Sequence, residues 1–532
     1  MAGTLLGVGG TDDRWDDLSP DGYAARAELA RRYREAFARH LEHPDPDQRH
    51  AARVMVDHLK FELDAFEQGD HLDAVRHLAS PFDRLRGIFD VMARDDDAAW
   101  EAIARRLATI DEPFAGYRAT LEEGRRQGRV AAVRQVRSVV GQARILASDE
   151  GAFTRLLADA ERRDLATPAL ADAVARARAA ASEFADYLEQ VYLPDATPTD
   201  GVGEERYVRE AERFLGLRLD PAEAYAWGWE ELHRLLAESR KVADEIVPGG
   251  SLREVVDFLE TDPERAASSP DEFIAFVERV EKQAVEDLAG VHFDVATEIR
   301  EVTVNLSPPG SPLGAHYLPP SEDFTRPGGV WYSLADPHHI PLYQEVSTAY
   351  HEGFPGHHLQ IGTVMVNRDR LSRAHRLLVW YSGYGEGWAL YAERLMDELG
   401  YLENPEYRLG MLASHLFRAA RVVVDIGLHL GLAIPSGAPL LADERWDFDR
   451  AVRFMTEVGM QSEAVADSEV KRYLGWPGQA ISYKLGEREI LRLRDELRRR
   501  QGSGFDLKAF HSTVLTCGEV RLDHLREVVL GS

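Results

Sequence analysis

The sequence contains very little cysteine: Cys517 is the only one in 532 residues. A single cysteine permits no intramolecular disulfide and no cage of thiolates around a metal ion. The chain also lacks any run of about 20 apolar residues, the length of a membrane-spanning helix, and its first residues lack the basic start and apolar core of a secretory signal. We therefore expect a cytoplasmic protein in which any metal is bound by His, Asp or Glu.

Basic residues are scarce relative to acidic ones, with 63 Lys and Arg against 91 Asp and Glu and a net charge of -28. Such a surface repels nucleic acid phosphates and anionic lipids, so we expect neither nucleic acid nor membrane as a partner. The same charge also serves simple solubility. Apolar residues at 44% provide enough material for a core. The composition leaves the oligomeric state open, a homodimer included.

Amphipathic helices dominate the first half of the sequence. From about residue 20 to 247, apolar side chains recur at spacings of three and four, as in AARVMVDHLKFELDAF. Pro, Gly and Asp accumulate in LPDATPTDGVG at 193–203 and break this pattern. We therefore expect an N-terminal helical lobe over 1–200 and a catalytic helical lobe over 201–532, although the two could also form one continuous domain.

A short β-rich segment interrupts the helical patterns. ATEIREVTVNL and GGVWYSLAD, between residues 296 and 336, are rich in β-branched and aromatic residues, and a loop rich in Pro and Gly separates them. Helical patterns resume after Pro341. The sequence therefore predicts a large, mainly α-helical fold with a small antiparallel sheet next to the helix that carries HEGFPGHH at 351–358.

HEGFPGHH differs from the usual HExxH zinc signature, in which two histidines one helical turn apart face one ion. Position i+4 from His351 is Pro355, and on an unbroken helix neither His357 nor His358 could share an ion with His351. Pro355 cannot donate to the carbonyl of His351, and Gly356 tolerates unusual dihedral angles, so the helix should break here. With Pro355 and Gly356 looped out, His357 becomes the second ligand and His358 the reserve choice.

EGWALYAE at 386–393, on another apolar helix, offers the carboxylate that a site with two histidines still needs. Zinc bound by two His and one Glu keeps one position open for water, the arrangement of a hydrolytic site. We therefore predict one Zn2+ per chain bound by His351, His357 and Glu386. Other divalent metals remain compatible with these ligands, because ligand type discriminates only weakly among them.

Two more carboxylates have predicted roles at this site. Glu352 follows a ligand on the same helix and is placed to take the proton of a water and pass it to a leaving amine. Glu393 lies on the same helix face as Glu386 and suits the support of a ligand from behind, with a solvated helix Glu as the alternative. For the whole motif, the alternative is a helix end followed by unrelated surface histidines.

These residues resemble a bacterial family known only as a domain of unknown function, whose signature is HExxPGHH followed by EGWALYAE. VVDIGLH at 423–429 and RYLGWPGQAISYKLG at 472–486 look like that family's C-terminal blocks, so the similarity covers residues 300–490. The family is similar in fold to the Taq-type zinc carboxypeptidases, which are gluzincin metallopeptidases with a long cleft between helical walls. The resemblance implies a metallopeptidase-like helical fold with a long central cleft, although a fold alone does not determine a function.

The block at 472–486 offers four candidate residues. Tyr473 and Tyr483 flank a PGQA turn, where a phenol could donate to a developing oxyanion, and Tyr483 is the preferred choice. Arg472 and Lys484 could pair with a substrate carboxylate, as in a carboxypeptidase or dipeptidase. The alternatives are packed core aromatics for the tyrosines and structural ion pairs for the two cations.

Two other pairs are candidates for the site: His429, Trp331 and Tyr332 for contact with substrate, and Asp425 for a supporting role behind it. Asp425 and His429 stand at i and i+4 on an apolar helix, where an unpaired charge is costly, so they should contact each other or the site. Trp331 and Tyr332 lie in GVWYSL, which looks like the edge strand beside a cleft, where an extended substrate can add a strand. The alternative is that both aromatic residues are part of the core.

Three functions follow from these observations. The first is a zinc metallopeptidase that cuts short peptides from one end. The second keeps the zinc chemistry but directs it at a non-peptide amide or another small metabolite. The third is a helical scaffold or binding protein, which would hold no stoichiometric zinc.

Overall fold

The chain folds into two compact, mainly helical units. The computed structural model describes residues 1–5, 10–307 and 314–531. The two units consist of Met1–Val202 with Lys471–Trp476 and of Gly203–Val470 with Pro477–Ser532. None of the described helices is long and apolar enough to cross a membrane.

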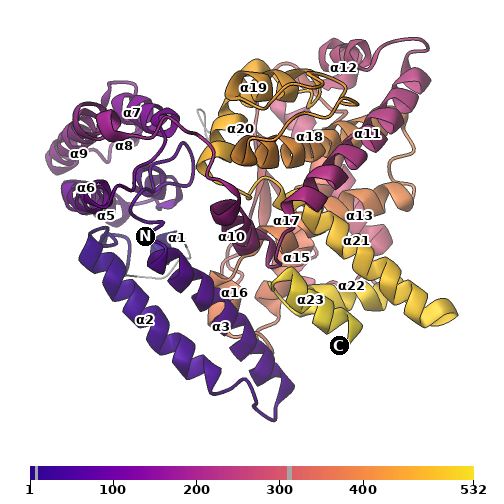
Figure 1. Cartoon of the computed structure of the whole chain (residues 1–532), viewed down its shortest axis with the longest axis horizontal. Coiled ribbons are helices and arrows are strands. Elements are labelled where there is room, and N and C mark those ends of the chain that lie inside the picture. The colour runs from indigo at the N-terminus through magenta and orange to yellow at the C-terminus, as the bar shows by residue number, and fades with distance from the viewer. Residues whose placement is uncertain (6–9, 308–313, 532) are drawn as a thin grey trace. The chain divides into compact units, whose positions relative to one another are not determined.

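The first unit is a bundle of helices around an aromatic core, in which α9 (Pro168–Tyr187) contacts four other helices, α5 to α8. α9 begins where the Thr167 side chain accepts a hydrogen bond from the Leu170 amide and Pro168 occupies the first turn. Its Phe184 ring stacks on the neighbouring aromatic rings of the core. Figure 1 shows α2 and α3 side by side as a hairpin.

The remaining helices of the first unit are α1 (Ala2–Leu5), α2 (Pro20–Ala38), α3 (Pro46–Glu67), α4 (Pro81–Gly87), α5 (Asp97–Ala108), α6 (Asp111–Arg126), α7 (Val133–Ala147) and α8 (Ala152–Arg162). Short 3-10 or π segments are η1 (Ile88–Val91), η2 (Leu188–Tyr192) and η3 (Leu193–Asp195). α20 (Glu463–Gly475) begins in the second unit and ends in the first.

The second unit is built on two long helices that pack against each other, α11 (Pro221–Ile246) and α18 (Pro405–Leu430). The others are α10 (Glu204–Leu215), α12 (Leu252–Thr261), α13 (Pro270–Leu288), α14 (Glu345–Glu352), α15 (His357–Val366), α16 (Arg373–Leu378), α17 (Ser382–Glu398), α19 (Phe448–Glu457), α21 (Ser482–Gln501), α22 (Leu507–Thr516) and α23 (Leu522–Leu530). Short 3-10 segments are η4 (Pro263–Arg265), η5 (Thr297–Ile299) and η6 (Gly502–Gly504).

α17 and α21 approach each other so closely that their backbones touch. A Cβ atom on Gly387 would collide with the backbone of Gly486, and one on Gly486 would collide with the carbonyl of Gly383. Glycine at positions 387 and 486 is therefore what allows the two helices to meet at this distance. The contact fixes the helix that carries EGWALYAE.

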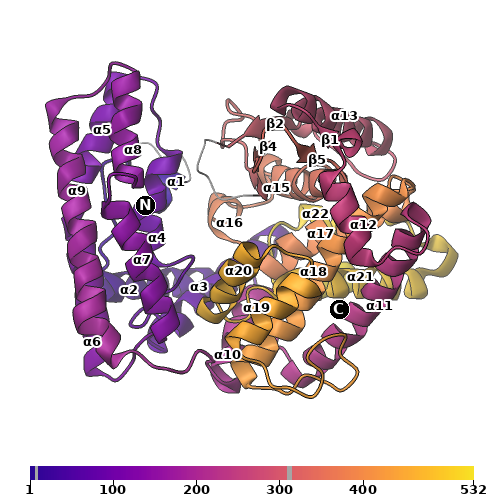
Figure 2. The ribbon, with the colours of Figure 1, turned by 90° about the horizontal axis from the view of Figure 1, so that it is seen from above.

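A small sheet packs on α13 in the second unit, as Figure 2 shows. β4 (Gly329–Ser333) pairs antiparallel with β3 (Gly314–Leu318) and parallel with β2 (Thr303–Leu306), and β1 (Ala266–Ala267) pairs antiparallel with β5 (Ile340–Pro341). The Tyr332 ring meets Phe273 of α13 edge to face, with centroids 5.0 Å apart. The prediction of a mainly helical fold with a small antiparallel sheet is confirmed, and one parallel pair is added to it.

The predicted edge position of GVWYSL is wrong. β4 is the central strand, in the order β2-β4-β3, because Gly314–Leu318 folds back and pairs with it. Both sides of β4 are therefore occupied, so a substrate cannot extend the sheet along Trp331 and Tyr332. Tyr332 is 3% exposed and belongs to the core beside α13, as the alternative for these aromatics stated.

Candidate metal centre

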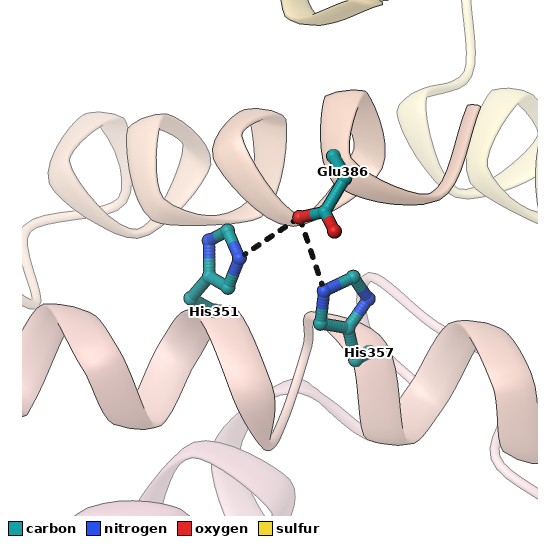
Figure 3. Close-up of side chains that lie close together, drawn as sticks. All are labelled: His351, His357 and Glu386. Carbon is teal, nitrogen blue, oxygen red and sulfur yellow. Dashed lines mark ion pairs between the residues drawn. The ribbon is translucent and has the colours of Figure 1, made fainter. Parts of the chain in front are cut away.

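Three side chains from three helices converge on one point in the second unit. His351 lies near the end of α14, His357 begins α15, and Glu386 lies in the first half of α17 (Figure 3). The Nε2 atoms of both histidines lie 3.5 Å from the same oxygen, Oε2 of Glu386. The potential ligand atoms of the three residues all lie within 4.8 Å of one another. The structure thus brings together the three residues selected from the sequence.

The helix break between the two histidines results from the FPG segment. α14 ends at Glu352 and α15 begins at His357, and the Phe354–Pro355 peptide bond is cis. A Cβ atom on Gly356 would collide with the carbonyl oxygens of the preceding helical turn, including that of His351. Only glycine therefore lets the chain turn tightly enough for His357 to face His351. Their rings are 5.0 Å apart and perpendicular.

Two buried side chains hold this break from either side. Oε2 of Glu281, on α13, accepts a hydrogen bond of 2.8 Å from the Phe354 amide, and burial raises the pKa of Glu281 well above its usual value. The Trp388 indole donates a hydrogen bond of 2.9 Å to the Pro355 carbonyl. A Cβ atom on Gly353 would collide with the Glu281 carboxyl group, which accounts for the first glycine of the motif.

Glu281 was missed from the sequence, although a signal existed. In α13 it continues the buried stripe of Phe273 and Val277 at a spacing of four residues. A carboxyl group on the apolar stripe of an amphipathic helix needs a partner inside the protein, and the Phe354 amide supplies one. The partner itself is remote in sequence and could not be named in advance.

Glu393 contacts the other side of the His351 ring. Its Oε1 lies 2.7 Å from Nδ1 of His351, and its Oε2 accepts a hydrogen bond from the Ser347 hydroxyl and lies 3.6 Å from Nε2 of His415. Burial raises the pKa of Glu393, but the contacts with His351 and His415 lower it by a larger amount. The pKa of Glu393 therefore lies well below its usual value. Glu393 thus fixes the ring so that Nε2 of His351 points at Glu386.

Behind His415 lies a buried cluster of charges. Nζ of Lys484 lies 3.2 Å from Nδ1 of His415 and 3.0 Å from a carboxylate oxygen of Glu231, and it also donates to Glu487. Lys484 is 1% exposed. Burial raises the pKa of Glu231, yet Lys484 and Arg234 lower it to about 2. Lys484 therefore forms structural ion pairs, which was the stated alternative to its predicted contact with substrate.

The three converging residues influence one another electrostatically. Burial lowers the pKa of His351, but contacts with Glu386 and Glu393 outweigh it and raise this pKa to about 9. Burial raises the pKa of Glu386, but His351 and His357 bring it below its usual value. The carboxylate of Glu386 is therefore ionised at neutral pH and available as a ligand.

The geometry fits a tetrahedral ion better than direct hydrogen bonds. An N···O distance of 3.5 Å exceeds the usual range for a good hydrogen bond. Zinc bonds of about 2.0–2.1 Å in a tetrahedron place neighbouring ligand atoms about 3.3–3.4 Å apart. His351, His357 and Glu386 could therefore hold a zinc ion with little movement, and a fourth position would remain for water or substrate.

Glu352 follows His351 at the end of α14, and its charge is one of the influences that raise the pKa of His351. It is half-buried, and among residues 1–5, 10–307 and 314–531 its side chain makes no hydrogen bond or ion pair. His358, the reserve ligand, points elsewhere: its Nε2 lies 2.9 Å from the Ile299 carbonyl, and burial lowers its pKa to about 4. His357 and not His358 thus joins the converging group.

The other predicted site residues have different neighbours. Oδ2 of Asp425 accepts hydrogen bonds from the Tyr207 hydroxyl (2.7 Å) and the Gly478 amide (3.0 Å), and its Oδ1 lies 3.6 Å from His429. Asp425 and His429 therefore contact each other, which was one of the two predicted alternatives. The guanidinium group of Arg421 lies 4.7 Å from the Tyr483 ring centroid.

Arg472 and Tyr473 belong to Lys471–Trp476, the segment that is part of the first unit. The Arg472 guanidinium lies 5.1 Å from the Tyr473 ring centroid, and Tyr473 is fully buried. Tyr473 is thus a packed aromatic, as its alternative interpretation stated.

Comparisons with known proteins identify the fold and the family. A structure described as "putative lipoprotein" from Colwellia psychrerythraea has a TM-score of 0.84 and 23% identity, over 100% of this chain and 95% of the other. Another, described as a "putative lipoprotein of unknown function" from Shewanella oneidensis, has a TM-score of 0.73 and 17% identity, over 99% and 96%. At these identities the likeness shows the fold alone, and no curated protein matches the chain. The profile described as "Bacterial protein of unknown function (DUF885)" matches residues 1–529, and the chain therefore belongs to this family.

Proposed function

We propose that this chain is a zinc-dependent hydrolase of short peptides or small amides, with Glu352 as its general base. The observation that carries the proposal is the convergence of His351, His357 and Glu386, in which both histidine Nε2 atoms lie 3.5 Å from one Glu386 oxygen, close to the ligand separation of a tetrahedral ion. The resemblance of HEGFPGHH and EGWALYAE to a family similar in fold to the Taq-type zinc carboxypeptidases adds to it.

Different residues of the chain would have different roles in hydrolysis. A zinc ion at this site would lower the pKa of a coordinated water and polarise a substrate carbonyl. Glu352, half-buried and without another partner among the described residues, can accept the proton of the attacking water and deliver it to the leaving nitrogen. Glu393 orients His351, and the Glu281 and Trp388 contacts keep the break that presents His357.

We propose carboxypeptidase or dipeptidase activity in particular. Lys484 is not the group that binds the carboxylate of the substrate. Lys484 is buried and held by Glu231 and Glu487. Recognition of a peptide end would therefore rest on other groups near the metal.

Metal analysis and peptide hydrolysis together test the proposal. We expect one zinc per chain after reconstitution and dialysis, and hydrolysis of unblocked di- to tetrapeptides. His351→Ala and Glu386→Ala should lose the zinc, whereas His338→Ala, which removes an exposed histidine, should keep it. Glu352→Gln should keep the zinc and lose about 10²- to 10⁴-fold in kcat.

Two results would contradict the proposal. A protein that retains no zinc would support the helical scaffold instead. Full activity in Glu352→Gln would remove Glu352 from the mechanism even if the metal is present.

A further inference from the structure

Two large apolar side chains are exposed on the segment that leads into α17. Leu378 is 49% exposed and Trp380 is 43% exposed, whereas Val379 and Tyr381 between and after them are 5% and 3% exposed. The backbone is extended at Val379 and Tyr381, so alternate side chains point to opposite faces. Leu378 and Trp380 therefore share one face of this segment, and the buried residues anchor the other.

The Trp380 ring lies against the candidate metal centre. Its centroid is 6.0 Å from that of His357, and a Cβ atom on Gly385 would collide with the six-membered part of the indole. Trp380 thus touches one ligand and the residue next to another, Glu386. The space left by the missing side chain of Gly385 is filled by the indole, and the next residue, Tyr381, donates a long backbone hydrogen bond of 3.4 Å to Glu519.

The candidate centre is partly exposed to solvent at Glu386, close in sequence to the exposed Trp380. The side chains of His351 and His357 are 5% and 7% exposed, whereas that of Glu386 is 15% exposed, and the Trp380 ring lies over Gly385, the residue before Glu386. A substrate that approaches the metal ligands from solvent on this side would pass over the indole. Exposed tryptophan is costly to leave in water, and its broad flat face suits aromatic and aliphatic groups.

We infer that Trp380, together with Leu378, binds an apolar or aromatic side chain of the substrate next to the bond that is cleaved. The inference rests on the proposed function and names its substrate class: neutral short peptides or amides with Phe, Leu or a similar residue beside the scissile bond. Trp380 is in this role a specificity residue, since it contacts substrate and takes no part in proton transfer.

Binding of two hydroxamates to the zinc-loaded full-length chain tests this without requiring turnover. Phenylalanine hydroxamate and glycine hydroxamate share the zinc-binding group and differ by a benzyl group. We expect the wild type to bind the first at least about 10-fold more tightly, the scale of discrimination that an apolar pocket achieves. Trp380→Ala should reduce this preference to less than about 3-fold, and Trp380→Phe should keep most of it.

Two further variants complete the set. Leu378→Ala, at an exposed position, should weaken the preference and serves if Trp380→Ala does not fold. Trp227→Ala removes a tryptophan that packs against Arg488 instead, and should leave the preference unchanged. Zinc content should be equal in all variants. Equal affinities of the two hydroxamates in the wild type, or an unchanged preference in both Trp380→Ala and Leu378→Ala, would overturn the inference.

Dipeptide hydrolysis separates this inference from the proposed function. We expect kcat/KM to be higher for Phe-Ala, Leu-Ala, Ala-Phe or Ala-Leu than for Ala-Ala, Asp-Ala or Lys-Ala. Hydrolysis of all these peptides at similar rates would overturn the inference and leave the hydrolase intact. A clear hydroxamate preference without hydrolysis of any peptide or small amide would overturn the hydrolase and leave the apolar site intact. A chain that binds no zinc would overturn both.

Discussion

The indole nitrogen of Trp388 donates a hydrogen bond to the carbonyl oxygen of Pro355 across 2.9 Å. Trp388 follows Glu386 on α17, and Pro355 lies in the break between His351 and His357. One buried hydrogen bond thus joins the helix that supplies the carboxylate to the loop that positions the second histidine. The two motifs of the sequence are parts of one structural element.

Trp388→Phe should weaken both the fold and the metal site. The phenyl ring keeps most of the packing, but the buried Pro355 carbonyl loses its donor, which costs about 1–3 kcal/mol in the free energy of unfolding. Because the break is then less restrained, we expect zinc affinity to fall as well. Urea unfolding and competition with a zinc chelator measure the two effects.

A matched control for this variant lies in the first unit. Trp100 is also buried and donates its indole hydrogen bond to a backbone carbonyl, that of Arg94, at 3.1 Å. Trp100→Phe should cost similar stability and leave zinc affinity unchanged. If Trp388→Phe binds zinc as tightly as the wild type, the hydrogen bond contributes to stability alone.

Gly356→Ala should disrupt the zinc site more severely than its small size suggests. The new methyl group would collide with the carbonyl oxygens of Tyr350 and His351, so the break must open and His357 must move away from Glu386. We expect zinc affinity to fall by more than about 10-fold, because metal sites tolerate only small displacements of their ligands. Gly437→Ala is the control, since open space surrounds that position. Equal zinc affinity in the two variants would contradict this account of the break.

The sequence was informative about the site wherever the constraint is local. Pro355 removes a helical hydrogen bond, and this alone predicted a break that could place His357 beside His351. The structure has that break, with α14 ending at Glu352 and α15 beginning at His357. The choice of Glu386 followed from the need for a third ligand, and the structure places its Oε2 at 3.5 Å from both histidines.

Relationships between segments remote in sequence could not be predicted. The residues of β4 indicate a strand correctly, yet the pattern does not say which strands flank it, so its central position was missed. In the same way, the sequence suggests that Lys484 is free to bind a substrate carboxylate, because it does not show that Glu231 lies 3.0 Å from its ammonium group. Glu281 is the opposite case: the sequence carries a signal for its role, since it lies on the buried stripe of α13, but no role was predicted for it.

Glu393→Gln should reduce zinc affinity by about 10- to 100-fold, the usual effect of removing a carboxylate that supports a metal-bound histidine. Glutamine has the same shape but no charge, so the His351 ring keeps a neighbour and loses its electrostatic support. Glu487→Gln, which changes a carboxylate two contacts further from His351, should have a smaller effect on zinc. Competition with a zinc chelator, as for Trp388→Phe, measures the zinc affinity of both variants. Equal losses in the two variants would indicate a general effect of the buried charges.

Glu519 should make the metal-free protein less stable as the pH rises. Glu519 is only 3% exposed, and this burial raises its pKa to about 8. The hydrogen bonds from Tyr381 and Gln360 lower the pKa by less, and the charge of Glu386 raises it a little more. The folded chain therefore keeps this proton up to about pH 8, whereas the unfolded chain loses it near pH 4.5. Stability from this group is complete below the lower value and is lost between the two.

Glu519→Gln removes the titration and keeps an oxygen that can accept the Gln360 hydrogen bond. At pH 8.5 the variant should be more stable than the wild type by on the order of 3–5 kcal/mol, because each pH unit of the window contributes about 1.4 kcal/mol. At pH 4.5 the two proteins should have the same free energy of unfolding. Urea denaturation at both values, with chelator present so that no cation compensates Glu386, measures the difference. A constant difference across the pH range would mean that Glu519 titrates alike in the folded and unfolded chains.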